Sequence, residues 1–142
     1  MEAVKREFEL KNATAKELAE AAVSVLIEKK ALDVRLYLVG EENPITDYYI
    51  NVTGRSLTQV GALADDLVDK LSECGAEAVR VEGRRGDSWI LVDYADVIVN
   101  VFDREARDFY NLDRLMPAGT QVDISDIISK VDKKLEIKNA ED

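Results

Sequence analysis

Three short segments of this chain carry residue types that could do chemistry, and the first is Gly54-Arg55-Ser56. A glycine and a hydroxyl at a helix N-terminus expose backbone amides that can hold a phosphate. Phosphoryl transfer also needs paired carboxylates that hold magnesium near the phosphates. The next predicted strand, residues 78–82, has no Asp-x-Asp pattern. A plain helix cap at Ser56 is therefore favoured over a nucleotide site, because serine is one of the commonest cap residues.

The second segment is Asp93-Tyr94-Ala95-Asp96, between two apolar runs at residues 89–92 and 97–102 that predict a β-hairpin. Carboxylates three residues apart could do acid–base work or hold a cation, whereas aspartates in turns more often bond the local backbone. Trp89, the only tryptophan, begins the same hairpin, and Tyr94 is expected at its tip. Tryptophan and tyrosine flanked by aspartate are typical of a protein-recognition surface. A partly buried core ring is the alternative for Trp89.

The third segment, Arg84-Arg85 beside Asp87, could bind an anion, but a solvated loop is the simpler interpretation. The chain has no histidine and a single cysteine, Cys74. These counts exclude a Ser-His-Asp triad, a His-ligated zinc site and an intrachain disulfide. Cys74 is expected at the C-terminal end of a helix, where the helix dipole does not activate a thiol. We therefore predict no catalytic residue, no cofactor and no metal site.

The net charge indicates which class of molecule the chain can bind. The chain has 142 residues, with 29 acidic and 19 basic side chains and a formal net charge of −10. Such a surface repels phosphate backbones, so direct nucleic-acid recognition is not expected and a basic protein is the easier partner. The length corresponds to one domain. No window is apolar enough to span a membrane, and residues 1–12 lack the apolar core of a signal peptide, so a cytoplasmic location is expected.

Caps and periodicity locate the elements that would position these residues. Thr14 and Glu17 form a capping box ahead of one helical pattern, and Ser56 and Gln59 form a second. Gly75 follows the second pattern as its C-terminal cap. The predicted elements are helices over 15–29 and 57–74, strands over 32–38, 48–52, 78–82, 89–92 and 97–102, a helix capped by Asp103, and a helix of about three turns after Asp123.

This order of elements predicts the α+β class, with a single mixed sheet of about five strands and helices mainly on one face. Ala106, Phe109, Tyr110 and Leu115 of the third helical unit are expected to face inward. We assign residues 1–116 to one domain and residues 117–142 to a C-terminal extension with an amphipathic helix. A short helix is marginal in water, so this one should dock on its own domain or on a partner or second copy.

Six segments stand in an order and spacing that is hard to obtain by chance. They are Ala31-Leu32-Asp33-Val34, residues 45–50, Thr53-Gly54-Arg55-Ser56, Glu82-Gly83, residues 89–99 and residues 107–115. Together they resemble the ribosomal silencing factor family, also called the Iojap or RsfS family. The resemblance covers residues 16–116, and the hairpin block at 89–99 is its most specific part.

The resemblance implies a degenerate nucleotidyltransferase-like fold without transferase activity, which agrees with the missing Asp-x-Asp pattern. It implies binding to the large ribosomal subunit at ribosomal protein L-fourteen, a block of subunit joining, repression of translation under nutrient limitation, and homodimers. Carried onto this chain, it implies an aromatic anchor, a tip contact, two acceptors for basic side chains and two rim contacts. These are, in that order, Trp89, Tyr94, Asp93 with Asp96, and Arg107 with Tyr110.

Two other functions stay open: a factor for large-subunit assembly, and, less favoured, a nucleotide-binding protein. Three positions depart from the family pattern, with Ala95 in place of the usual glycine, Asn100 in place of histidine and Met116 in place of a common tryptophan. Alanine resists the positive φ that glycine allows, so the turn is expected to differ. Asparagine cannot take up a charge, so any pH response through that position is lost.

Overall fold

A single mixed sheet with helices on both faces makes up the fold. The structure, a computed structural model, describes residues 8–40 and 43–141. In chain order the elements are α1 (Ala15–Glu28), β1 (Leu32–Leu38), β2 (Tyr48–Thr53), α2 (Leu57–Glu73), β3 (Arg80–Glu82), β4 (Trp89–Asp93), β5 (Val97–Phe102), α3 (Arg104–Tyr110), the 3-10 helix η1 (Leu112–Leu115), β6 (Gln121–Val122) and α4 (Ser125–Glu141). The predicted α+β class and single mixed sheet are confirmed. Strand β6 was not predicted, because two residues are too few to show an alternating pattern.

The sheet has six strands in the order β3-β4-β5-β2-β1-β6. The central strands β2 and β5 are parallel, and the other pairs are antiparallel, including the predicted hairpin of β4 and β5. Successive side chains of a strand point to opposite faces. Along β5, Val99 and Val101 therefore point into the main core, whereas Asn100 and Phe102 point to the other face.

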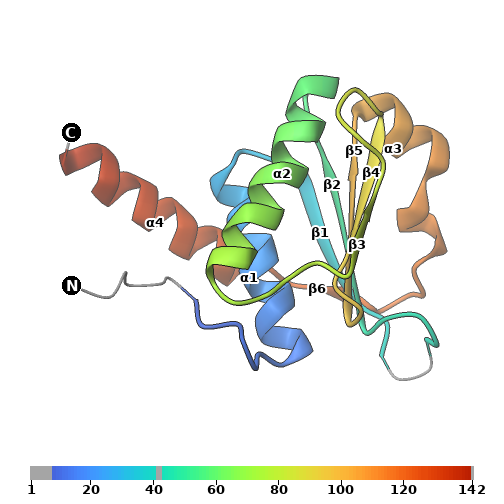
Figure 1. Cartoon of the computed structure of the whole chain (residues 1–142), viewed down its shortest axis with the longest axis horizontal. Helices are drawn as coiled ribbons and strands as arrows, with labels where there is room; N and C mark the ends of the chain where they lie inside the picture. Colours follow the sequence, from blue (N-terminus) through green and yellow to red (C-terminus); the bar gives the residue numbers. More distant parts are fainter. Residues whose placement is uncertain (1–7, 41–42, 142) are drawn as a thin grey trace.

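Helices α1 and α2 lie side by side on one face of the sheet (Figure 1). Helix α1 begins with the predicted capping box, in which the hydroxyl of Thr14 and the carboxylate of Glu17 each accept the other residue's amide at 3.1 Å. At α2 only half of the predicted box forms. The hydroxyl of Ser56 accepts the amide of Gln59 at 3.1 Å, but the side chain of Gln59 accepts the amide of Arg55 instead of returning to Ser56.

The opposite face of the sheet, which we call the outer face, is covered in part by α3 and η1 (Figure 1). The predicted cap of α3 is confirmed, since the carboxylate of Asp103 accepts the amide of Ala106 at 2.9 Å. Ala106 is buried as predicted. The inward prediction is wrong for Phe109 and Leu115, which are 81% and 72% exposed, and for Tyr110, which is 46% exposed although its ring packs on Trp89. The reason is that the seven-residue helix turns Arg107, rather than Phe109, toward polar groups of the sheet.

The segment after Met116 is built into the same fold. Strand β6 pairs with Leu36 and Tyr37 of β1. The carboxylate of Asp123 accepts the amide of Ser125 at 2.9 Å, and α4 then runs for 17 residues, longer than predicted. Helix α4 packs against α1, so docking on its own domain is confirmed for this helix. Among the helices described, none is both long and apolar enough to cross a lipid bilayer.

Candidate protein-interaction surface

A row of hydrogen-bonded polar side chains crosses the outer face toward η1. The indole N–H of Trp89 donates to Oδ1 of Asn100 at 3.0 Å. Nδ2 of Asn100 donates to Oδ1 of Asn51 at 3.1 Å, and Nδ2 of Asn51 donates to Oδ1 of Asp113 at 3.1 Å. Because these residues come from β4, β5, β2 and η1, the row ties three strands to the short helix at its end.

Asp113 accepts hydrogen bonds from two further side chains. The hydroxyl of Tyr37 donates to Oδ1 at 2.7 Å, and Arg107 donates to Oδ2 at 2.7 Å and to Oδ1 at 3.2 Å. Burial by itself raises the pKa of Asp113, but the hydrogen bonds from Arg107, Tyr37 and Asn51 outweigh it and hold that pKa below its ordinary value. The carboxylate is therefore charged at neutral pH, which strengthens each of these bonds.

Arg107 is held inside the protein and is only 6% exposed. Its Nη1 donates to the hydroxyl of Thr53 and to the backbone carbonyl of Asp33, each at 3.0 Å. Asp33 lies at a register shift in β1 and has a φ of +44°. The prediction that Arg107 lies on an exposed rim is therefore wrong, because its charge pairs with Asp113 below the surface. We call Tyr37, Asn51, Thr53, Asn100, Arg107 and Asp113 the polar network.

Four aromatic rings adjoin the polar network at Trp89. The ring centroid of Trp89 lies 5.1 Å from that of Phe102 and 4.7 Å from that of Tyr110, and Tyr110 in turn meets Phe109 edge-on at 5.0 Å. Phe102 is fully buried, Trp89 is half-buried and Tyr110 is 46% exposed. The partly buried ring that was the alternative for Trp89 is what the structure shows. Because Tyr110 packs on Trp89 while leaving nearly half its surface exposed, the cluster runs from the core to the solvent.

The large apolar side chains that α3 and η1 leave exposed are Phe109, Tyr110 and Leu115, and we call them the α3–η1 patch. A hollow of about 400 Å³ lies beside it and is lined by Ser88, Asp103, Glu105, Ala106, Phe109 and Tyr110. Large exposed apolar side chains with an adjacent hollow are features of protein–protein contacts, in which a few anchors carry most of the binding energy. The arrangement suits recognition of another protein.

The two aspartates of the hairpin are placed differently. Oδ1 of Asp93 accepts the amide of Ala95 at 2.7 Å, and Oδ2 lies 3.3 Å from Nε of Arg80. The turn interpretation of Asp93 is therefore confirmed. The side chain of Asp96 is exposed, while its backbone carbonyl accepts the amides of Asp47 and Tyr48.

Tyr94 points into the core and is 6% exposed. It continues the alternation of Ile90 and Val92, which face the same core, so the prediction that Tyr94 is displayed at the hairpin tip is wrong. Burial, followed by the charge of Glu77, raises the pKa of its phenol far above the ordinary value. The expectation about the turn is also wrong, because Ala95 adopts the left-handed conformation with a φ of +71°.

The segment Gly54-Arg55-Ser56 is engaged in structural contacts. Ser56 caps α2, as favoured from the sequence, and the guanidinium of Arg55 donates to the carbonyl of Lys30 at 3.0 Å. A Cβ at Gly54 would lie 3.0 Å from Val60, so the close packing of strand and helix requires glycine here. Within the described ranges, no group of three His, Cys, Asp or Glu side chains could hold a metal ion.

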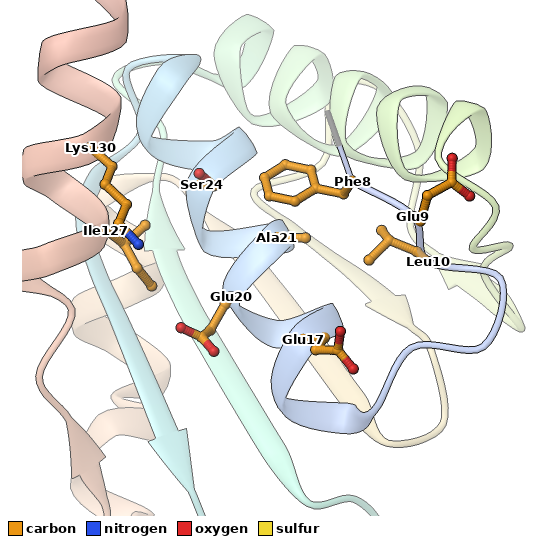
Figure 2. Close-up of a pocket in the computed structure, with 9 residues that line it drawn as sticks. All are labelled: Phe8, Glu9, Leu10, Glu17, Glu20, Ala21, Ser24, Ile127 and Lys130. Atoms are coloured by element: carbon orange, nitrogen blue, oxygen red, sulfur yellow. The ribbon is translucent and has the colours of Figure 1, made fainter. Parts of the chain in front are cut away.

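A second hollow, of about 440 Å³, lies between α1, α4 and the segment at residues 8–10 (Figure 2). Phe8, Leu10 and Ile127 surround a stretch of α1 that contributes Ala21 and Ser24. The rest of its lining is Glu9, Glu17, Glu20 and Lys130. None of the residues that line it belongs to the polar network or to the α3–η1 patch, so the two regions are separate.

Comparison with known proteins assigns the family. The family model described as "Ribosomal silencing factor during starvation" matches residues 12–142. The chain belongs to the ribosomal silencing factor (RsfS) family. The match confirms the resemblance found over residues 16–116 and also includes residues 117–142.

Relatives of this RsfS-family chain include both bacterial and animal proteins. "Ribosomal silencing factor RsfS" of Halalkalibacterium halodurans is 34% identical over 113 residues, covering 80% of this chain and 97% of that protein. A Mus musculus protein named "Mitochondrial assembly of ribosomal large subunit protein 1" is 30% identical over 96 residues, covering 66% of this chain and 42% of that protein. An X-ray crystal structure of a Chromobacterium violaceum protein matches with a TM-score of 0.70 and 29% identity, covering 80% of this chain and 97% of that one.

Sequence reasoning missed the centre of the polar network. Asp113, Asn51 and Tyr37 were not among the predicted site residues, although they hold the surface elements together. One signal was available: Asn51 and Asn100 each interrupt an apolar strand run, and a buried amide needs hydrogen-bond partners. The identity of those partners was not readable from the sequence, because Asn51 and Asp113 are 62 residues apart.

Proposed function

We propose that this chain binds the large ribosomal subunit through ribosomal protein L-fourteen, prevents the small subunit from joining, and so represses translation under nutrient limitation. The observation that carries this proposal is the exposure of Phe109, Tyr110 and Leu115 on an RsfS-family fold, with Tyr110 packed on the half-buried Trp89. A cluster that extends from the core to the solvent can bury an aromatic anchor against a partner at little cost in side-chain entropy.

The proposed mechanism is steric. A folded domain bound on the surface where the subunits meet excludes the second subunit by its volume, so no covalent step, cofactor or metal is required. Trp89 and Tyr110 are the proposed anchors, and Asp93 and Asp96 are proposed acceptors for basic side chains of the partner. Among these, the exposed Asp96 is the better placed, because Asp93 already bonds Ala95 and faces Arg80.

The charge of the chain supports a basic protein as the direct partner. A formal net charge of −10 attracts basic ribosomal proteins during diffusional encounter and repels exposed RNA phosphates. We propose a cytoplasmic location for the same activity. We also propose a homodimer, as the family resemblance implies.

Co-sedimentation tests the proposal directly. The purified chain is mixed with isolated large subunits, small subunits are added, and the joined fraction is read from a gradient. We expect the wild type to travel with large subunits and reduce joining. The double variant Phe109→Ser with Leu115→Ser should do neither, and it should stay folded because both side chains are already exposed. Ile137→Ser is the matched control, since Ile137 is 63% exposed on α4, which packs on α1.

The proposed function would be overturned by a wild type that stays at the top of the gradient while joining is normal. A double variant that binds and blocks as well as the wild type does would overturn the proposed contact, because the α3–η1 patch would then not be the binding surface.

A second candidate is a role in assembly of the large subunit, which the name of the Mus musculus relative favours. It uses the same surface at an earlier step. Cells lacking the protein would then accumulate immature large particles, and mature subunits would join normally in its presence. A nucleotide-binding role is the remaining alternative, and magnesium-dependent binding of nucleotide in a calorimeter would revive it.

A further inference from the structure

The polar network and the α3–η1 patch meet at one side chain, Trp89. One part of its indole packs on Tyr110 with ring centroids 4.7 Å apart. The N–H of the same indole donates into the network through Asn100 and Asn51. The orientation of the proposed anchor is therefore set both by an aromatic contact and by a chain of hydrogen bonds that ends at Asp113.

The elements that cover the outer face are short, and η1 in particular has little packing against the sheet. Helix α3 has seven residues and η1 has four, and they are joined at Asn111, which has a φ of +46°. None of the residues of η1 is buried. The side chains of Phe109 and Leu115 point outward and so contribute little packing against the sheet. Polar ties to the strands run from Asp113 to Tyr37 and Asn51 and from Arg107 to Thr53 and Asp33. The bond between Arg107 and Asp113 joins these two sets.

A carboxylate suits this position for a chemical reason. Asp113 faces donors only: a phenol, an amide N–H₂ and a guanidinium. An ionised carboxylate has two oxygens and no proton to place, so it can accept from all of them. An asparagine would turn one N–H₂ group toward a donor and would leave the buried guanidinium of Arg107 without its nearest counter-charge.

We propose that Asp113 is a positioning residue for partner binding: it locks α3 and η1 onto the sheet and, through Asn51 and Asn100, fixes the orientation of the Trp89 anchor. This inference rests on the proposed function for its binding consequence. The effect of Asp113 on the orientation of Trp89 can be measured in the isolated protein, without a partner.

The test uses Asp113→Asn in the full chain, with two readouts. The fluorescence of Trp89, the only tryptophan, reports the polarity around the indole, and acrylamide quenching reports its exposure. We expect red-shifted emission and stronger quenching in the folded variant. Affinity for large subunits, measured below the unfolding temperature, should fall about tenfold, as expected for losing charge-assisted hydrogen bonds worth about 1.4 kcal/mol.

Asp65→Asn is the matched control, because Asp65 also pairs with an arginine, Arg85, at 2.7 Å but on the exposed surface. It should leave emission, quenching and affinity unchanged. Circular dichroism checks that each variant is folded. If Asp113→Asn does not fold, Tyr37→Phe replaces it, since that change removes one hydrogen bond to Asp113 and keeps the buried ring. Its emission and affinity should change in the same directions, by a smaller amount.

A folded Asp113→Asn variant with wild-type emission, quenching and affinity would overturn the inference, as would the same result for Tyr37→Phe where that variant has to be used. A purely structural role lowers the melting temperature but leaves the folded fraction with normal affinity and normal Trp89 emission. If the wild type itself does not bind large subunits, the proposed function fails. The emission and quenching of the variants then decide whether Asp113 positions Trp89.

Discussion

At the scale of single residues, the buried hydroxyl of Tyr94 is a defect in the core. Within the described part of the chain it is the buried side-chain oxygen that lacks a hydrogen-bond partner. Burying a hydroxyl unpaired costs about 1–3 kcal/mol. We expect Tyr94→Phe to raise the free energy of unfolding by about 1 kcal/mol in urea titration, with ribosome binding unchanged. A loss of stability would mean that the hydroxyl has a partner, such as an ordered water.

Ala95 carries a second local cost, since its φ of +71° is unfavourable for any residue with a Cβ. Glycine has no such penalty there, although it loses more backbone entropy on folding. We expect Ala95→Gly to stabilise the protein by about 0.5–1 kcal/mol, seen as a higher urea midpoint with an unchanged slope. Ala62→Gly inside α2 is the control and should destabilise by about 1 kcal/mol. Equal effects of the two changes would contradict the explanation.

The lowered pKa of Asp113 predicts that the stability of the fold depends on pH. Its pKa is lower in the folded chain than the ordinary value, so the unfolded state binds a proton more readily. The stability that the Asp113 carboxylate contributes is therefore fully present above about pH 4, the ordinary pKa of aspartate. It is lost as the pH falls toward the lower pKa that Asp113 has in the folded protein. We expect Asp113→Asn to lose more stability at neutral pH than near pH 3, so the two stability curves should converge in acid. Parallel curves would show that the charge of Asp113 is not what stabilises the fold.

At the scale of elements, α4 is attached by its apolar face. Val131 is 3% exposed, whereas the ion pair of Lys134 with Glu28 lies at the surface at 3.0 Å. We expect Val131→Ala to lower the free energy of unfolding by about 2 kcal/mol and Lys134→Ala by less than about 1 kcal/mol. Hydrogen exchange should report faster opening of α4 in the first variant only. The reverse order would indicate that charge, rather than burial, attaches α4.

Elements with strong local signals were the ones that sequence reasoning located well. The start of α1 at Ala15 and both ends of β1 agree with the prediction, because a capping box and a period-two pattern are encoded in neighbouring residues. Strand β6 and η1 were missed because each is too short to show a period. The inward prediction for Phe109 failed because a two-turn helix gives too few positions to define a face.

At the scale of the whole molecule, the net charge of −10 should govern how fast a basic partner is found. Salt shortens the range of this attraction from about 10 Å at 0.1 M to about 3 Å at 1 M. We expect the association rate with isolated L-fourteen to fall steeply over that range, while the dissociation rate, set by the apolar anchors, changes little. Asp96→Asn should reduce the salt dependence slightly, and Phe109→Ser should raise the dissociation rate instead. A salt-independent association rate would exclude charge steering.

The sequence by itself determined the order of the longer elements, the α+β class, the acidic net charge and the family, because caps, alternation, charge and ordered motifs are all local. Even the burial of Tyr94 could be inferred from the sequence, because residues 90, 92 and 94 follow the alternation of one strand and therefore face the same side of the sheet. Only the tertiary structure decided which polar groups meet, since Tyr37 and Arg107 find their partners Asp113 and Thr53 across 76 and 54 residues. A buried hydrogen bond depends on the approach of distant segments, and no local pattern specifies that approach. For the same reason, Arg107 and Asp113 together could be recognised as the internal support of the α3–η1 patch only after the chain was folded.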